Sequence, residues 1–547
     1  MSINQSKRNV FQVVFDIMFI IKIKDYLENQ NMPTITKIRI RNFKRFEDYT
    51  IVPNKHMNIF VGDNETGKSS LLEAISLVMN GTSKKQESIN LYNLFNANAV
   101  RTFLESDQEY DKLPSLEIDL FFDGLIDPSF SGNNNIDKEK NAYGIRMISR
   151  PNVDYILEIK DIIHPGNKVF PFEFYETKFT TFGDSLYFMN RNKPRSIYVD
   201  ASKMSTSFST DEYIRTIFRK YTESDKKIRT KLLSEFNKYH ASFANDNLKS
   251  LIADDNAKFV IKNSTLDEFE NNLTILEEDI NIANRGTGKQ IIIKTQMALK
   301  KIDENIDVVL IEEPENHLST TNLKKLVSDI ESSQDEQVFI ATHSGYICSR
   351  LSLNNVFVLG FSGTAPTSLA TLSSETAKYF IKAPSVGILD FSLSKKTILV
   401  EGPSEYMLFD KFYKKVADCS PEDDGVQIIA VRGLSFKRYM ELGKFLDYKI
   451  AVVTDNDGDY EGCMNRYRDN VSSQIQVFSD CNNDERTFEI ALYLCNKSFI
   501  DELFPGKDDI IQFMLKNKTD VAYALLNSET DLVTPKYIED AIEWIRK

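Results

Sequence analysis

The sequence predicts a multidomain α/β protein. Its length of 547 residues corresponds to about three or four compact units, at roughly 100 to 200 residues per domain. Short apolar runs rich in β-branched residues recur in the second half, with helical patterns between them, which is typical of parallel strands covered on both faces. These runs are Val308–Ile311, Val338–Ala341, Val356–Leu359, Thr397–Val400 and Ile450–Val453.

The composition is that of a soluble globular protein. Hydrophobic residues make up 41% of the chain and charged residues 27%, with only 15 Pro and 21 Gly, which excludes collagen-like, mucin-like and mainly disordered proteins. The 67 basic and 80 acidic residues give a net charge of −13, which argues against a histone-like coating of nucleic acid but leaves room for a local basic track. The five cysteines form no C-x-x-C pair, so we predict reduced thiols in a cytoplasmic protein.

Residues 1–31 precede the first patterned domain sequence and form a predicted N-terminal extension. Its apolar stretch, Val10–Ile21, contains Asp16, is followed by lysines and is too short to span a bilayer. We interpret it as an amphipathic helix. A signal peptide is one alternative, and a start of translation at Met32 is another. No membrane association is predicted.

A phosphate-binding loop follows the predicted strand at residues 57–61. Residues 62–69 fit G-x-x-x-x-G-K-[ST] at every position, and a helical apolar pattern begins at Leu71. In such a loop the backbone N–H groups turn toward phosphates, Lys68 neutralises the β and γ oxygens, and Ser69 offers its hydroxyl to Mg²⁺. The predicted ATP-binding residues here are Gly62, Asn64, Gly67, Lys68, Ser69 and Ser70.

The acidic partner of this loop is predicted at the end of a buried strand. Glu312 and Glu313 follow the run at residues 308–311. Glu312 would hold Mg²⁺ directly or through water, and Glu313 would orient or deprotonate the attacking water. The alternative is that both acids only cap the next helix. His343, at the end of the following strand, could sense the γ-phosphate, although a lone histidine is more often structural.

A glycine turn at Gly286 and Gly288 precedes a predicted helix, and taken alone it is a weak signal. Together with the phosphate loop and the acidic strand end, in this order, it resembles the signature of the ATP-binding-cassette (ABC) ATPases of the SMC and RecF type. In that family the G-x-G-x-Q turn reaches across a dimer to the partner's ATP, so the resemblance implies a homodimer or a higher homo-oligomer formed through the ATPase domain. Glu312 departs from the family pattern, since most relatives have Asp at this place.

Composition and pattern also divide the chain into segments. The charged helical sequence inserted within the ATPase motifs would form an arm or a dimer contact, or a solvated hairpin with no partner. A stretch rich in Ser, Thr, Ala and Pro begins at Phe361 and is the linker candidate. Short β-type runs precede the insertion, at Leu116–Phe122, Tyr155–Ile159 and Ser196–Val199. The predicted boundaries are 1–31 for the extension, 32–205 for the first part of the ATPase domain, 206–280 for the helical insertion, 281–360 for the second part of the ATPase domain, 361–394 for the linker and 395–547 for a C-terminal α/β domain.

Carboxylates follow two buried strands of the C-terminal domain. Glu401 comes directly after the run Thr397–Val400, and Glu405 follows four residues later. The second strand, Ile450–Val453, is followed by the D-x-D-G sequence at residues 455–458. If the two strand ends lie side by side, the acids of both come together, and a group of carboxylates suits Mg²⁺ or Mn²⁺. Alone, D-x-D-G is equally typical of a calcium loop or a surface turn. The predicted metal ligands are Glu401, Glu405, Asp455, Asp457 and Asp459.

The pairing of Glu-Gly on one strand with D-x-D-G on the next resembles the Toprim fold of topoisomerases, primases and OLD-family nucleases. In OLD nucleases a later Glu completes a second metal site and a Lys near the C-terminus acts at the scissile phosphate. The resemblance assigns these roles to Glu489 and Lys518, for which a helix cap and a solvated face are the alternatives. Two metal ions roughly 3.5 to 4 Å apart would stabilise both the attacking and the leaving oxygen.

A cassette ATPase followed by a Toprim domain resembles the OLD (overcoming lysogenization defect) family, and the length and compact insertion resemble most the A subunit of the Gabija anti-phage system. The resemblance implies a metal-dependent DNA endonuclease or nickase that ATP controls in bacterial defence against phage, with a UvrD-type helicase as partner if the Gabija resemblance holds. The alternatives are a RecF- or SMC-like repair ATPase whose Toprim domain does not cleave, a topoisomerase or primase, and an ATP-gated sensor that only holds DNA. The candidate DNA tracks are Lys37, Arg39, Arg41, Lys44, Arg45, Lys437 and Arg438, although a solvated surface explains them almost as well.

Overall fold

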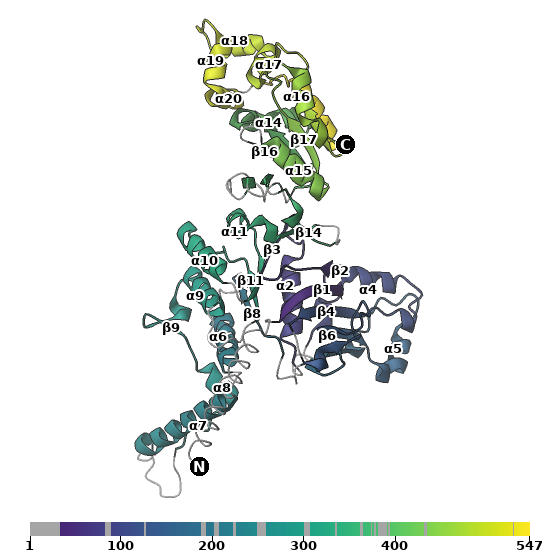
Figure 1. The fold of residues 1–547 in the computed structure, drawn as a ribbon, viewed down its shortest axis with the longest axis vertical. Helices are drawn as coiled ribbons and strands as arrows, with labels where there is room; N and C mark the ends of the chain where they lie inside the picture. Colours follow the sequence, from purple (N-terminus) through teal and green to yellow (C-terminus); the bar gives the residue numbers. More distant parts are fainter. Residues whose placement is uncertain are drawn as a thin grey trace, which may run out of the picture. The chain divides into compact units, whose positions relative to one another are not determined.

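The computed structural model (Figure 1) falls into two compact units, the first made mainly of residues 64–342 and the second mainly of residues 367–547. The predicted extension 1–31 lies outside the described residues. The structure describes residues 33–82, 89–124, 127–187, 193–201, 207–222, 226–248, 259–299, 307–333, 336–360, 365–373, 375–376, 379–380, 391, 394–431, 435–528 and 530–547.

The first unit begins with an antiparallel sheet whose strand order is β2-β1-β4-β6-β5, with β7 also paired to β6. Alternating apolar residues of β1 are buried, so one face of this sheet forms a core. The strands are β1 (Thr34–Phe43), β2 (Phe46–Ile51), β4 (Leu116–Asp123), β5 (Ser131–Gly132), β6 (Ala142–Pro151) and β7 (Tyr175–Thr181).

A second sheet carries the phosphate loop, with the order β14-β13-β3-β12-β11-β8. Its four strands from β3 to β8 run parallel. All five residues of β11 and of β12 are buried, as expected for strands covered on both faces. The strands are β3 (Met57–Val61), β8 (Ser196–Asp200), β11 (Val308–Glu312), β12 (Gln337–Ala341), β13 (Val356–Val358) and β14 (Thr367–Ser368).

Helix α2 (Lys68–Met79) packs on strands of both sheets and joins them into one body. The helical pattern predicted from Leu71 places its apolar residues on the buried side. The other helices of this unit and of the segment up to residue 350 are α4 (Ala97–Leu104), α5 (Ile156–Ile162), α6 (Ser207–Tyr221), α7 (Lys226–Phe243), α8 (Leu266–Asn271), α9 (Thr287–Leu299), α10 (Thr320–Ser332) and α11 (Gly345–Arg350).

One predicted strand in this region is wrong. Residues 155–159 were predicted to form a strand, but they lie in the 3-10 turn η4 (Val153–Tyr155) and in helix α5. Asn152 accepts a hydrogen bond from the backbone N–H of Asp154 and so starts a helical turn, and Ile159 is the buried residue of the helix. The other two runs form strands β4 and β8, as predicted.

Helix α6 of the segment 206–280 contacts α9, the helix of the glycine turn. The Tyr213 hydroxyl in α6 donates a hydrogen bond to the backbone oxygen of Lys294 in α9, at 2.6 Å. Helix α8 packs on both α6 and α7. Exposed apolar side chains remain on α7, at Ile228, Leu232, Tyr239 and Phe243.

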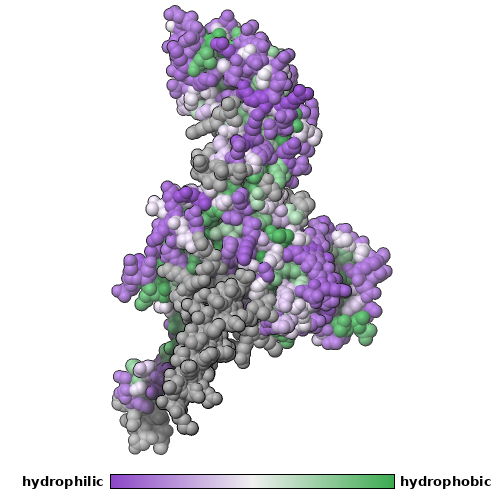
Figure 2. Space-filling view, in the orientation of Figure 1, coloured by the Kyte–Doolittle hydropathy of each residue, from purple (hydrophilic) through white to green (hydrophobic). Residues whose placement is uncertain are grey.

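The second unit contains a four-stranded parallel sheet in the order β16-β15-β17-β18. Its core combines strand residues such as Val400 and Val453 with helix residues such as Phe412. Hydrophilic residues cover most of its visible surface (Figure 2). The strands are β15 (Lys396–Val400), β16 (Val426–Ala430), β17 (Lys449–Val453) and β18 (Ile475–Phe478), and the helices are α14 (Pro403–Ala417), α15 (Phe436–Leu446), α16 (Tyr460–Tyr467), α17 (Phe488–Cys495), α18 (Lys497–Leu503), α19 (Ile510–Lys516), α20 (Lys518–Leu526) and α21 (Lys536–Arg546).

The sheet that carries the phosphate loop and the parallel sheet of the second unit, with their covering helices, confirm the predicted α/β class. Short, buried parallel strands occur in both units, where the apolar β-branched runs predict them. Among the residues that the structure describes, no helix has the length and apolar character needed to cross a bilayer.

Candidate functional sites

The phosphate loop leads from β3 into α2 through Gly67, whose φ of 99° is in the left-handed region. A Cβ atom at this position would lie 2.5 Å from Cδ of Arg45 and 2.8 Å from Cζ of Phe46. The glycine is therefore required both by the backbone conformation and by the close approach of the β1–β2 turn. Lys68 is buried at the start of the helix, where the positive end of the helix dipole favours an anion.

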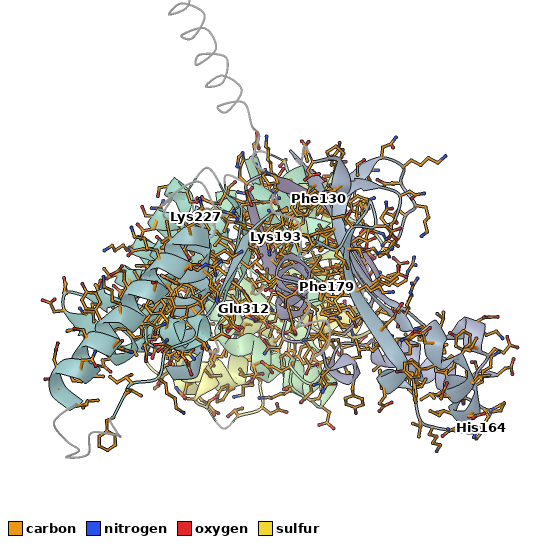
Figure 3. The ribbon with its side chains drawn as sticks, turned by 90° about the horizontal axis from the view of Figure 1, so that it is seen from below. Phe130, His164, Phe179, Lys193, Lys227 and Glu312 are labelled. Atoms are coloured by element: carbon orange, nitrogen blue, oxygen red, sulfur yellow. The ribbon has the colours of Figure 1, made fainter. Side chains whose placement is uncertain are left out.

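The acidic strand end lies on β11. Glu312 is only 5% exposed, and Figure 3 shows it among the other side chains near the centre of the view. Glu313 has a φ of 46°, and its Oε2 atom accepts a 2.5 Å hydrogen bond from Asn316. Helix α10 is capped instead by Ser319, whose hydroxyl accepts from the N–H of Asn322. The alternative in which the two glutamates merely cap the next helix does not fit this geometry.

The glycine turn forms the start of α9. A Cβ atom on Gly288 would lie 2.4 Å from the backbone oxygen of His317, so the turn packs tightly against the segment after β11. Nothing lies within 4 Å of the corresponding position on Gly286, which faces open space. Gln290 is buried and donates a 2.9 Å hydrogen bond to the backbone oxygen of Arg285. His343 is exposed in the loop before α11.

The carboxylates of the C-terminal unit meet at the ends of neighbouring strands β15 and β17. One oxygen of Glu401 accepts hydrogen bonds from the Thr454 hydroxyl at 2.5 Å and from the Asp455 N–H at 2.9 Å. Asp455 Oδ1 in turn accepts from the N–H of Phe488, the first residue of α17, at 2.8 Å. These bonds tie three chain segments into one site.

The electrostatics of the site place two further acids in it. Burial, followed by the charges of Glu401, Glu405 and Glu489, raises the pKa of Asp455 to about 8. Burial also raises the pKa of Glu405 to about 7, and Glu489 and Glu401 add to the effect. Four carboxylates therefore lie close enough to repel one another: Glu401, Glu405, Asp455 and Glu489. We call them the carboxylate cluster.

Lys518 lies at the edge of the carboxylate cluster. Its Nζ atom is 2.9 Å from Oε2 of Glu489, which is 4% exposed, while the lysine side chain is 48% exposed. Burial lowers the pKa of Lys518, but the hydrogen bond to Glu489 and the charges of Asp455 and Glu405 outweigh burial and raise it. The structure thus brings together the later glutamate and the C-terminal lysine that the sequence selects.

Asp457 and Asp459 lie outside this cluster. Both are exposed, whereas burial and the charges of Glu401 and Glu489 raise the pKa values of Asp455 and Glu405. Asp457 has a φ of 54°, and its N–H donates to the backbone oxygen of Arg486. Asp459 caps α16, because one of its oxygens accepts from the N–H of Gly462 at 3.0 Å. Their side chains are therefore exposed rather than part of the buried cluster, and we call this exposed pair the rim of the site.

The chemistry of the cluster fits a divalent cation. The four carboxylates repel one another, and two of them, Glu405 and Glu489, belong to buried side chains, so a cation would relieve the repulsion. In the described part of the chain, no group of three or more His, Cys, Asp or Glu side chains is arranged to hold an ion by itself. Mg²⁺ usually keeps several waters and binds through one or two carboxylates plus substrate phosphates, so the donors present match its needs when water and a phosphate complete the shell.

Two residues of these sites were not selected from the sequence. Thr454 precedes Asp455 and fixes Glu401 through its hydroxyl. Tyr537 on α21 is buried, and burial followed by the charges of Asp455 and Glu405 raises its pKa well above the usual value. A hydroxyl residue at a strand end gives a weak hint for Thr454, whereas Tyr537 lies far along the chain from the motifs.

The predicted DNA track at residues 37–45 is not an open basic surface. Lys37 and Arg39 both pair with Asp137, and Arg39 pairs with Asp48 as well. Lys44 pairs with Glu73, and Arg45 packs on the phosphate loop. In the second unit, Arg438 pairs with Glu375 at 2.9 Å. Acids of neighbouring strands and loops therefore pair with these cations.

Without divalent ions, we expect the stability of the protein to fall as the pH rises from 6 to 8.5. The pKa values of Asp455 and Glu405 lie near 8 and 7 in the folded chain, above about 4 in the unfolded chain. The folded state therefore binds more protons than the unfolded state in this interval, so the free energy of unfolding decreases as the pH rises. Thermal unfolding with a chelator should show a melting temperature lower by several degrees at pH 8.5, and Mg²⁺ should restore it.

Asp455→Asn is the matched control for this experiment. The amide cannot ionise and is a poor ligand for Mg²⁺, so both the pH dependence and the Mg²⁺ effect should shrink. An unchanged response in this variant would show that other groups cause it.

Comparisons with known proteins agree with this arrangement. Residues 34–161 match the AAA ATPase domain family, and residues 393–457 match the family described as overcoming lysogenization defect protein-like, TOPRIM domain. The chain is similar to Endonuclease GajA of Bacillus cereus (strain VD045), with 28% identity over 163 residues, which are 29% of this chain and 28% of that protein. It is also similar to DNA replication and repair protein RecF of Acetivibrio thermocellus, with 38% identity over 61 residues, 10% of this chain and 16% of that protein.

Among solved structures, the C-terminal region of the OLD protein of Xanthomonas campestris pv. campestris matches with 20% identity and a TM-score of 0.21, covering 28% of this chain and 92% of that one. The matched segments span less than a third of the length of either curated relative. The family matches confirm that the chain combines an AAA ATPase domain with an OLD-like Toprim domain, as its motifs predict.

Proposed function

We propose that this chain, which combines an AAA ATPase domain with an OLD-like Toprim domain, is a divalent-metal-dependent DNA endonuclease or nickase controlled by ATP binding or hydrolysis. The observation that carries the proposal is the convergence of the carboxylate cluster with Lys518 at one edge of the C-terminal sheet. A buried group of acids beside a half-exposed cation suits metal-assisted phosphodiester hydrolysis better than a structural role.

Each residue of the cluster has a proposed part in this reaction. Divalent ions, when bound, would supply stabilisation of the attacking and leaving oxygens. The Thr454 hydroxyl and the N–H of Asp455 both bond to one oxygen of Glu401. These two bonds hold the side chain and so fix the direction of its second oxygen. Lys518 would stabilise negative charge on the phosphate. Asp457 and Asp459, at the rim, would act as outer ligands.

The ATPase domain has a corresponding set of proposed roles. Lys68 and Ser69 would bind the phosphates and the ion that accompanies them, with Glu312 as the acidic partner and Glu313 as the group that orients the attacking water. Gly286, which faces open space, would contact the nucleotide held by a second copy, with His343 as the γ-phosphate sensor. This arrangement requires a homodimer, to which the segment 206–280 would contribute through the exposed apolar residues of α7.

A role in bacterial anti-phage defence, in the cytoplasm and with a UvrD-type helicase as partner, is the finer part of the proposal. It comes from the resemblance of the motifs to the Gabija system, while the similarity to Endonuclease GajA supports the endonuclease activity. We also propose the boundaries given above, with the ATPase domain interrupted at 206–280 and the Toprim domain beginning at 395. A RecF-like repair ATPase is the second candidate, because a short segment is 38% identical to RecF.

Cleavage of plasmid and linear DNA by the purified chain, with Mg²⁺ or Mn²⁺ and increasing ATP, tests the proposal. We expect cleavage by the unchanged protein and by Lys68→Ala, but with a loss of the response to ATP in the variant. Lys55→Ala, which changes an exposed lysine before β3, at the end of that strand away from the loop, should respond to ATP as the unchanged protein does. ATP hydrolysis without cleavage under any of these conditions would favour the repair ATPase.

A further inference from the structure

The Tyr198 hydroxyl donates a hydrogen bond to Oε2 of Glu312, across 114 residues of sequence. Glu312 is the acid at the place where the resembling ATPases mostly have Asp. A glutamate is one methylene longer and has one more rotatable bond, so its carboxylate needs an additional constraint to occupy a single position.

Strand register explains why these two side chains meet. Strands β8 and β11 are parallel neighbours in which Tyr198 pairs with Leu310 and Asp200 pairs with Glu312. Paired residues of neighbouring strands point to the same face, so Tyr198 and Glu312 are diagonal neighbours on one face, within reach of a tyrosine and a glutamate. Helix α2, which begins with Lys68, packs on both strands.

The contact has a defined donor and acceptor. The hydroxyl of Tyr198 is the donor, and Oε2 of Glu312 is the acceptor. The acceptor side chain is enclosed, because only 5% of the Glu312 surface is exposed. One oxygen is held by the phenol, and the other remains for an ion or its water.

We propose that Tyr198 is a positioning residue that holds the Glu312 carboxylate in place for the Mg²⁺ that accompanies ATP. The phenol compensates for the longer side chain of Glu312. The inference rests on the proposed ATP-binding function of the phosphate loop. It predicts that Tyr198 matters only when residue 312 is a glutamate, because the shorter aspartate would neither reach the phenol nor need it.

A double-mutant cycle tests this dependence through binding rather than turnover. The variants are Tyr198→Phe, Glu312→Asp and the double variant, each titrated with Mg²⁺ in the presence of a fluorescent ATP analogue and followed by anisotropy. Tyr198→Phe removes one hydrogen bond to a charged group, which corresponds to about a tenfold higher Mg²⁺ concentration for half-maximal binding. In the Glu312→Asp background the same change should shift binding less than about twofold.

Tyr187→Phe is the matched control. The Tyr187 hydroxyl is buried in the same unit, and the backbone oxygens of Met79 and Pro194 share its one proton, so the variant removes a buried tyrosine hydroxyl without changing the contact to Glu312. Thermal unfolding of each variant without nucleotide separates loss of fold from loss of Mg²⁺ binding. An equal shift from Tyr198→Phe in both backgrounds, or no shift beside Glu312, would overturn the inference. Absence of Mg²⁺-dependent binding in the unchanged protein would overturn the ATP-binding proposal as well.

Discussion

Glu401→Gln is expected to reduce DNA cleavage at least about a thousandfold, while ATP hydrolysis stays unchanged. Glu401 is the member of the carboxylate cluster that both Thr454 and the N–H of Asp455 hold in place. A neutral amide of the same size keeps the volume but removes a charged ligand, and metal ions contribute several kcal/mol of transition-state stabilisation. The measurement is the initial rate of plasmid nicking with Mg²⁺ or Mn²⁺, beside a steady-state ATPase assay.

Glu422→Gln is the matched control, because it makes the same chemical change at an exposed position of the same unit. This variant should cleave at the rate of the unchanged protein. If Glu401→Gln still cleaved at a comparable rate, the carboxylate cluster would not be the nuclease centre. Loss of cleavage together with a lower melting temperature would instead indicate a folding effect, and Thr454→Val would then separate the two, since it leaves every carboxylate in place.

The local motifs made much of the fold and both sites predictable. A phosphate loop needs a strand, a glycine turn and a helix in direct succession, so eight consecutive residues define it, and Gly67 has the backbone conformation that the motif requires. Apolar β-branched runs predict buried parallel strands, because only side chains that tolerate burial on both faces fit there. Since the carboxyl ends of parallel strands meet at one edge, Glu401 and Asp455 could be expected to lie together.

What the sequence leaves unpredicted depends on contacts between distant segments. Tyr198 meets Glu312 only because of the register of β8 and β11, which no local spacing encodes. Asp457 shares the D-x-D-G pattern with Asp455, and Asp459 directly follows it, yet both side chains are exposed, because Asp457 adopts a left-handed conformation and Asp459 caps α16. The wrong strand at residues 155–159 has a similar origin, since a cap at Asn152 outweighs the β-type composition of a short segment.

Basic residues illustrate the same limit. Positive charges that alternate along β1 suggest a nucleic-acid track, but the neighbouring strands β2 and β4 and the loop at residues 133–139 carry the acids that pair with them. A strand read alone shows only its own charges. Net charge per strand therefore predicts a binding surface less well than the charge of the whole sheet face.

Glu313→Gln is expected to lower ATP hydrolysis about a hundredfold or more while leaving ATP binding intact. The backbone N–H of Glu313 is fixed to Ala341 at 2.8 Å and its side chain accepts from Asn316, so an amide can occupy the same place without disturbing the turn. General-base or water-orienting groups contribute a factor of about 10² to 10⁴. Single-turnover hydrolysis and nucleotide binding measured side by side would separate the two effects. Because retained ATP should keep two copies together across the glycine turn, the variant is also expected to sediment as a dimer with ATP. Glu331→Gln is the control, because it makes the same chemical change at an exposed position of α10. This control should hydrolyse ATP and sediment as the unchanged chain does. Hydrolysis at the normal rate in Glu313→Gln would assign the water-orienting role to another residue.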